Sequence, residues 1–298
     1  MTTTDVPTIA QFFEAWELFQ YPAASGAVAG ALLGWLGVYV VLGRMVFLSA
    51  ALSQAAGLGV ALAFWLQIVW GMTGSPLASP WVGATVMTVI ATLLLMADRS
   101  PGGTRREAIL GFAYLAGAAG TLAVGTRIAA EIHDIESLLL GSAVAVLPDD
   151  FRLLATVAAI ILAIHAWGAR GLVQAAFSPD AARVRGLPVA ALRIVLLGSI
   201  ALAISVCTRV IGALPVFALS VLPAAAATRL APSVRWSLWL ATAIGAFAGF
   251  AGYVVAFLYS LPVGASQTLV AAAITAVVFA AGIPSVLIAR SRRARRAA

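Results

Sequence analysis

The chain has 298 residues, of which 62% are hydrophobic and only 10% are charged. A soluble domain usually carries about 45–50% apolar and about 25% charged residues, so this composition excludes a water-soluble globular protein and predicts an all-α integral membrane protein. All 18 basic residues are arginines, and the absence of lysine excludes a P-loop lysine, a Schiff base or a lysine general base within these residues.

Residues 1–20 are predicted to form an extracytoplasmic interfacial segment. Phe12 and Trp16 stand among Glu14 and Glu17, a pattern typical of a helix that lies in the membrane interface before the first span. We therefore expect this segment to act as an anchor.

A bundle of about nine transmembrane helices is predicted from the apolar runs, because a helix needs about 20 mostly apolar residues to cross the hydrocarbon core. These helices form a transmembrane domain over residues 21–289 and leave residues 290–298 as a basic cytoplasmic tail. The predicted spans are residues 21–42, 47–72, 81–97, 108–125, 151–168, 190–207, 211–230, 236–258 and 267–289.

The distribution of arginine predicts the orientation of the bundle. With the basic tail in the cytoplasm and an odd number of spans, the amino terminus lies outside, and every arginine falls inside except Arg127, Arg152 and Arg209. Arg209 follows an apolar run and is predicted to snorkel to the interface. Most acidic residues fall outside, so the net charge of +7 reflects topology and predicts no nucleic-acid partner.

Glycines recur at close spacing in the first and eighth predicted spans. Such spacing lets helix backbones approach closely, so it predicts either a tight bundle or a dimer face. These glycines are Gly26, Gly30, Gly34, Gly245, Gly249 and Gly252.

A dense cluster of potential metal ligands follows the fourth predicted span. It consists of Glu131, His133, Asp134 and Glu136. On a helix Glu131 would share a face with Asp134, and His133 with Glu136, so the sequence predicts a metal site at the outer mouth. The alternative is a solvated face or a docking surface for a partner.

The other histidine, His165, falls near the inner end of the fifth predicted span. A histidine inside a membrane span is a candidate for a functional role, here an exit ligand for a cation. Its imidazole would equally suit a hydrogen bond to a neighbouring helix, or a position at the interface.

The inside loop over residues 171–189 predicts a short capped helix. Ser178 or Asp180 can cap its start, Pro179 suits its first turn, and Gly186 marks its end. Such a helix would be a docking element on the cytoplasmic face, the alternative being a solvated connector.

Three segments resemble hallmark segments of the zinc/manganese-type ABC transporter permease family. Residues 43–64 read GRMVFLSAALSQAAGLGVALAF, residues 177–186 read FSPDAARVRG, and residues 210–231 read VIGALPVFALSVLPAAAATRLA. Their order and separation are also similar to those of the family, and the resemblance extends over residues 21–282.

The resemblance implies an integral permease of the bacterial plasma membrane that dimerises, binds a separate ABC ATPase and receives a divalent metal from an extracytoplasmic binding protein. ATP-driven transport requires a Walker A lysine, which these residues lack, so the energy source would be another polypeptide. The chain itself would be no enzyme and would hold no cofactor, since the metal is its transported substrate. The ATPase-coupling residues implied by the resemblance are Phe177, Ser178, Pro179, Asp180, Arg183, Arg185 and Gly186.

The metal-ligand positions of the family are altered in this chain. Family members commonly have Gly-Asp-Ala-Leu-Ser-His-Ala where the second span begins, but here the aspartate position is Ala50 and the histidine position is Gln54. A further acidic position aligns with Ser142. The pathway would retain Ser49, Ser53 and Gln54, whose oxygens are weak ligands for zinc.

The predicted function is that of a permease subunit for a divalent transition metal, with zinc first and manganese or iron next, working by alternating access. Two alternatives stay open. The same fold would suit a chelated metal or another small solute, because the strong ligands of the second span are absent. The bundle would also suit a non-transporting membrane scaffold.

Overall fold

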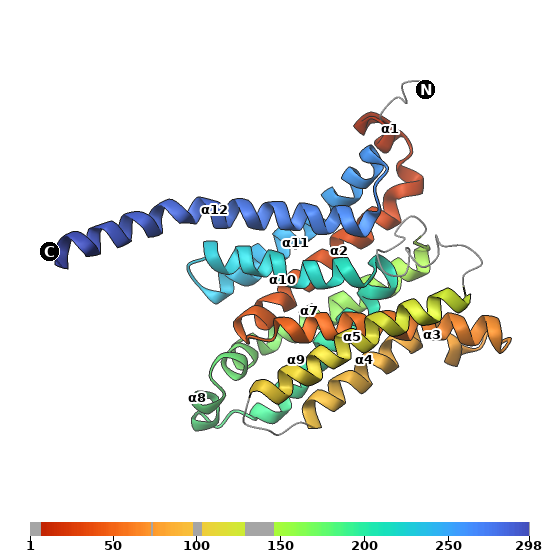
Figure 1. Ribbon diagram of the computed structural model, residues 1–298, viewed down its shortest axis with the longest axis horizontal. Helices are drawn as coiled ribbons and strands as arrows, with labels where there is room; N and C mark the ends of the chain where they lie inside the picture. Colours follow the sequence, from red (N-terminus) through yellow and green to blue (C-terminus); the bar gives the residue numbers. More distant parts are fainter. Residues whose placement is uncertain (1–6, 73, 98–102, 129–145, 298) are drawn as a thin grey trace.

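The computed structural model describes residues 7–72, 74–97, 103–128 and 146–297, of which residues 97, 103–106 and 282–297 are described by their backbone alone. Over these residues the chain folds as a bundle of α-helices without a β-strand, which confirms the predicted all-helical class (Figure 1). The elements are α1 (Ile9–Glu14), α2 (Trp16–Leu42), α3 (Val46–Val69), the short 3-10 helix η1 (Pro76–Ala78), α4 (Pro80–Ala97), α5 (Gly103–Ile128), α7 (Pro148–Phe177), α8 (Pro179–Val184), α9 (Val189–Ile211), α10 (Ala213–Leu230), α11 (Val234–Tyr259) and α12 (Val263–Ala297).

Among the described helices, eight are long and apolar enough to cross a membrane, namely α2, α3, α5, α7, α9, α10, α11 and α12. The remaining predicted span, residues 81–97, corresponds to α4, whose apolar stretch Pro80–Met96 is shorter. A stretch of about 17 residues rises roughly 26 Å, slightly less than a hydrocarbon core of about 30 Å. The ninth crossing, and with it the orientation of the two termini, stays a prediction.

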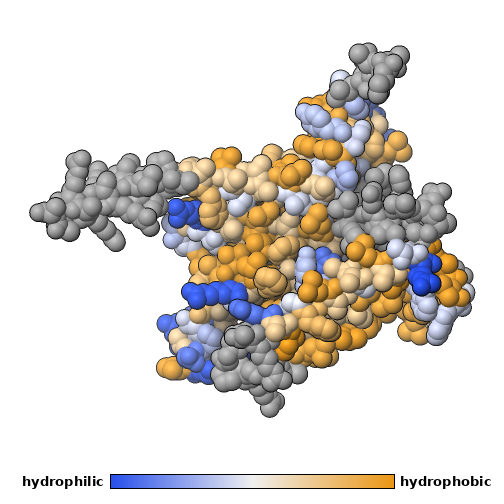
Figure 2. Space-filling model, viewed as in Figure 1, coloured by the Kyte–Doolittle hydropathy of each residue, from blue (hydrophilic) through white to orange (hydrophobic). Residues whose placement is uncertain are grey.

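The two ends of the bundle differ. α8 lies at one end, here called the α8 end, and α1 lies at the opposite end, here called the α1 end (Figure 1). α7 runs to Phe177 at the α8 end, beyond the predicted end of its span at Gly168. Figure 2 shows hydrophobic side chains along the flank of the bundle, with hydrophilic groups gathered towards its ends, as expected where lipid surrounds the flank.

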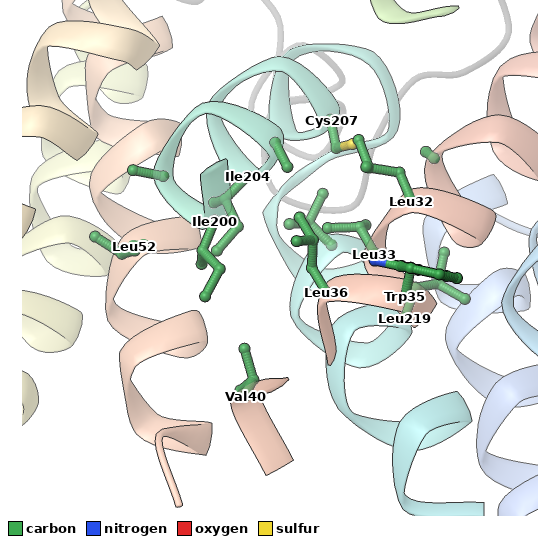
Figure 3. Close-up of a cluster of buried hydrophobic side chains, with 14 of the residues drawn as sticks. Leu32, Leu33, Trp35, Leu36, Val40, Leu52, Ile200, Ile204, Cys207 and Leu219 are labelled. Carbon is green, nitrogen blue, oxygen red and sulfur yellow. The ribbon is translucent and has the colours of Figure 1, made fainter. Parts of the chain in front are cut away.

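The helices form two groups that α9 connects. α2 packs against α7, α10 and α11, whereas α3 packs against α4 and α5, and α9 contacts members of both groups. Leu33 and Leu36 from α2 meet Leu52 from α3, Ile204 from α9 and Leu219 from α10 in one buried cluster (Figure 3). The apolar interior is therefore shared by the two groups.

The glycines of α2 bring its backbone into contact with that of α11. A methyl group placed on Gly30 would come within 2.0 Å of the Gly245 carbonyl oxygen, and one on Gly34 within 2.3 Å of the Ala241 carbonyl oxygen. Gly26 faces Gly249 in the same way. The glycine spacing therefore produces a tight bundle within one chain. The dimer-face interpretation is wrong for this stripe, because α11 of the same chain covers it.

α1 is folded against the α1 end of α11. The Thr8 side chain caps α1, and the ring of Phe12 is completely buried against Tyr253 and Phe257. α2 begins at Trp16, so only one residue, Ala15, lies between the two helices. The segment that the sequence assigns to the interface thus contacts the bundle through one aromatic cluster.

Replacing Gly30 with leucine is expected to destabilise the bundle, because the new side chain would force α2 and α11 apart. Overpacking of this kind costs about 1–3 kcal/mol, which corresponds to a fall in the thermal midpoint of roughly 2–5 °C in detergent for a chain of this length. Gly198→Leu in α9 is the control, since no atom of the described part of the chain lies within 4 Å of a methyl group placed there. Equal thermal midpoints for the two variants would contradict the packing.

Candidate functional site

The predicted short helix of the 171–189 loop is present as α8. Pro179 occupies its first turn, and Gly186 follows it with φ of 73°, a left-handed conformation that glycine adopts without strain. Ser178 is the N-cap residue, but its side chain makes no capping hydrogen bond, and neither does Asp180 cap the helix. α8 therefore begins through the fixed φ of proline and ends at the turn made by Gly186.

α8 is attached to the bundle on one side and exposed on the other. Ala182 is completely buried, whereas Val184 is 89% exposed. Asp180 and Arg183 form an exposed ion pair with each other, with Nη1 2.6 Å from Oδ1. An exposed pair of this kind contributes only about 0–1 kcal/mol, so both side chains stay available to a partner. Arg185 is exposed next to them.

The serines of α3 face the bundle interior. The Ser49 hydroxyl is hydrogen-bonded to the Ser220 hydroxyl of α10, and Ser220 donates its own proton to the Phe217 carbonyl oxygen at 2.8 Å. Ser49 is therefore the donor in the bond between the two serines. Ser53 is also buried, and its hydroxyl donates to the Ala50 carbonyl oxygen of its own helix.

Gln54 points in another direction. Gly117 of α5 lies directly against the Cβ and carbonyl group of Gln54. Five residues along an α-helix correspond to a rotation of about 140°, so Gln54 cannot share the face of Ser49. Among the residues that the structure describes, none is a hydrogen-bond partner for the buried oxygen Oε1 of Gln54. The structure thus separates three pathway residues that the sequence grouped, with Ser49 towards α10 and Gln54 towards α5.

His165 lies on the buried face of α7 and contacts α2. Its side chain is completely buried, and its ring centroid is 5.3 Å from that of Tyr39, with the two planes at 84°. No pattern in the sequence singled out Tyr39. A phenol inside an apolar helix is a signal that could have found it, because polar groups in membrane spans are costly and tend to have a role.

Arg209 lies at the α1 end of α9. The carbon of its guanidinium group is 6.0 Å from the ring centroid of Phe64 and 5.9 Å from that of Trp81. Such distances allow cation–π attraction from both rings. The side chain thus packs between aromatic residues of α3 and α4.

The predicted outer metal site lies outside the described residues, as do all four of its members and Ser142. Within the described residues no group of three or more histidine, cysteine, aspartate or glutamate side chains is placed to hold a metal ion. Further along the sequence, Asp149 and Asp150 occupy the first turn of α7, and Asp149 pairs with Arg152 at 2.8 Å. The metal site at this mouth stays a prediction.

The sequence matches known membrane proteins along most of its length. The model of the ABC 3 transport family matches residues 15–282. The high-affinity zinc uptake system membrane protein ZnuB of Haemophilus influenzae is 26% identical over 254 residues, which cover 85% of this chain and 93% of that protein. The manganese transport system membrane protein MntC of Halalkalibacterium halodurans is 24% identical over 283 residues, which cover 95% of this chain and 94% of that protein.

A solved structure has the same fold. PsaBC from Streptococcus pneumoniae, determined in complex with a Fab, superposes with a TM-score of 0.78 and covers 91% of this chain and 95% of the matched chain. The sequence identity of that pair is 22%, so this likeness establishes the helical arrangement alone.

The hydrogen bond between Ser49 and Ser220 is expected to couple α3 to α10. Ser49→Ala should lower the free energy of unfolding by about 0.5–1.5 kcal/mol, because Ser220 keeps its bond to Phe217. A double-mutant cycle with Ser220→Ala, followed by thermal unfolding in detergent, measures the coupling. Ser237→Ala is the control, since the Ser237 hydroxyl bonds only within its own helix. Strict additivity of the two substitutions would contradict the bond.

Proposed function

Because the chain belongs to the ABC 3 transport family, we propose that it is the membrane permease subunit of an ATP-driven importer for a divalent transition metal. The observation that carries this proposal is the family match over residues 15–282, which includes every described membrane-spanning helix together with α8. The named zinc and manganese transport relatives support a metal as cargo. They also favour transport over the scaffold alternative.

A separate ATPase subunit would supply the energy. These 298 residues contain no lysine and so hold no Walker A motif, whose lysine reaches the phosphates of ATP. The chain would therefore contribute the pathway and the partner would contribute hydrolysis. Two permease copies, an extracytoplasmic metal-binding protein and the lipid bilayer complete the proposed assembly in the bacterial plasma membrane.

The proposed contact with the ATPase is α8. The arginine distribution predicts that the α8 end is cytoplasmic. α8 offers Val184, Arg185 and the exposed Asp180–Arg183 pair, while its buried Ala182 anchors it to the bundle. α8 contacts α7, which belongs to the α2 group, and α9, which contacts both groups. A displacement of α8 would therefore be transmitted to both groups of helices.

Zinc is the proposed first cargo, followed by manganese and then iron. Imidazole nitrogen suits zinc, whereas hydroxyl and carbonyl oxygens suit manganese, and the pathway residues include both kinds of atom. A second candidate for the cargo is a chelated metal or another small solute. The lack of strong metal ligands on α3 favours it. Ala50 offers no ligand there, and Gln54 faces α5 instead of the serines.

Uptake into proteoliposomes tests the proposal. The permease is purified with its ATPase and reconstituted with ATP in the lumen, and the loaded metal-binding protein is added outside. We expect accumulation of radioactive zinc or manganese that depends on ATP. Vesicles that hold a nonhydrolysable ATP analogue are the control. If neither zinc, manganese nor iron accumulates in the presence of ATP, the proposed function is wrong.

Reversing the charge of Arg185 is expected to weaken coupling, because a repulsive contact would face the ATPase. Arg185→Glu should lower ATP-dependent uptake roughly tenfold without lowering the thermal midpoint. Arg229→Glu is the control, as Arg229 is also exposed and in the last turn of α10 at the same end. An equal loss of uptake in both variants would show that α8 has no special role.

The proposed outer metal site is tested by removing two of its ligands. His133→Ala combined with Asp134→Ala should lower the initial rate of uptake by about tenfold, because capture of the cation at the mouth would be lost. Glu14→Ala removes an exposed acidic side chain that the predicted topology also places outside, and it serves as the control. Unchanged uptake in the double variant would identify the cluster as a solvated face.

A further inference from the structure

One buried face of α7 carries a single polar side chain. The residues of α7 that are buried recur at helical spacing and point towards the bundle, as expected for a helix with its other side in lipid. They are Leu154, Ala158, Ile161, His165 and Leu172. An imidazole thus occupies a position where its neighbours above and below on the helix are aliphatic.

Tyr39 of α2 lies against this imidazole. Both side chains are buried, with 0% of His165 and 2% of Tyr39 exposed. The rings meet at a centroid distance of 5.3 Å, edge to face. Within the described structure, neither ring nitrogen of His165 nor the hydroxyl oxygen of Tyr39 has a hydrogen-bond partner. Two helices therefore bring into ring contact two buried side chains whose polar atoms have no partner within the described structure.

Packing alone does not account for these residues. A buried polar atom without a partner costs free energy, and the cost is greater where bulk water cannot reach the atom. Leucine at position 165 and phenylalanine at position 39 would fill similar space without that cost. What the two residues add is ligand capacity, because a neutral imidazole has one free nitrogen lone pair and a phenol has an oxygen.

The position of the pair suits a late step of import. Tyr39 lies in the last turn of α2, at the end of the bundle that carries α8, and His165 lies on the helix that leads without interruption into the α8 turn. A displacement of α8 would thus move His165 relative to Tyr39. The serine pair of α3 and α10 lies against another face of α2, because Gly37, which contacts the backbone of Ser220, is rotated by about 200° from Tyr39.

We propose that His165 and Tyr39 form an inner binding station for the transported cation, and this inference rests on the proposed function. The imidazole nitrogen would bind a borderline divalent ion such as zinc, the phenol oxygen would be the second ligand, and water would complete the coordination. Two protein ligands bind an ion only weakly. Weak binding suits a site on a transport pathway, because such a site must release the ion that it captures. Closing and opening of the contact would follow the movement of α8.

Uptake of two metals by ligand variants tests the station. The complex of permease and ATPase, in proteoliposomes, is prepared with Tyr39→Phe, His165→Leu or His165→Gln. We expect Tyr39→Phe and His165→Leu to lower the rate of zinc uptake by about tenfold or more, while the thermal midpoint stays the same or rises. Tyr253→Phe is the matched control, since it also removes the hydroxyl of a buried tyrosine but in the aromatic cluster of α1 and α11.

The ratio of zinc to manganese uptake separates binding from packing. His165→Gln replaces a nitrogen ligand with an oxygen ligand and should shift the ratio towards manganese by about tenfold, because manganese prefers oxygen. Uptake that is unchanged in all three variants, or that falls equally for both metals together with the thermal midpoint, would overturn the station and leave the proposed function intact. Failure of the wild-type complex to transport either metal would instead overturn the proposed function itself.

Discussion

The contact between the backbones of α2 and α11 holds the larger group of helices together. Gly26, Gly30 and Gly34 leave no room for a side chain, so carbonyl groups of α11 lie directly against α2. Apolar burial drives helices together much less in lipid than in water, and close approach of backbones supplies van der Waals contact instead. With α11 fixed on this side, the remaining faces of α2 meet α10 and α7, which is how Tyr39 reaches His165.

Side-chain hydrogen bonds between helices fix how far one helix is shifted along its neighbour. Ser49 binds Ser220 between α3 and α10, and Thr85 binds Ser205 between α4 and α9 at 2.8 Å. The Gln267 side chain donates to the Gly249 carbonyl oxygen at 3.0 Å, in the space that the glycines of α11 leave open. Bonds of this size set the register of the bundle but are weak enough to exchange during a movement of its parts.

Hydropathy predicted where the eight long apolar helices lie, because the length of an apolar run decides whether it can span a bilayer. It could not predict where α7 ends, since residues 169–177 continue as good helix formers after the apolar stretch stops. The family resemblance read from three segments was confirmed by the match over residues 15–282. Partners such as Tyr39 for His165, or Ser220 for Ser49, were beyond the sequence, because they depend on which helix faces meet.

The length of α7 has a mechanical consequence. Its 30 residues rise about 45 Å, roughly 15 Å more than a hydrocarbon core of about 30 Å. A helix longer than the hydrocarbon core can act as a lever arm, so a force applied at α8 would be transmitted along α7 into the bundle. In the proposed importer, the movement of α8 by the ATPase and the movement of His165 would be coupled through this one helix.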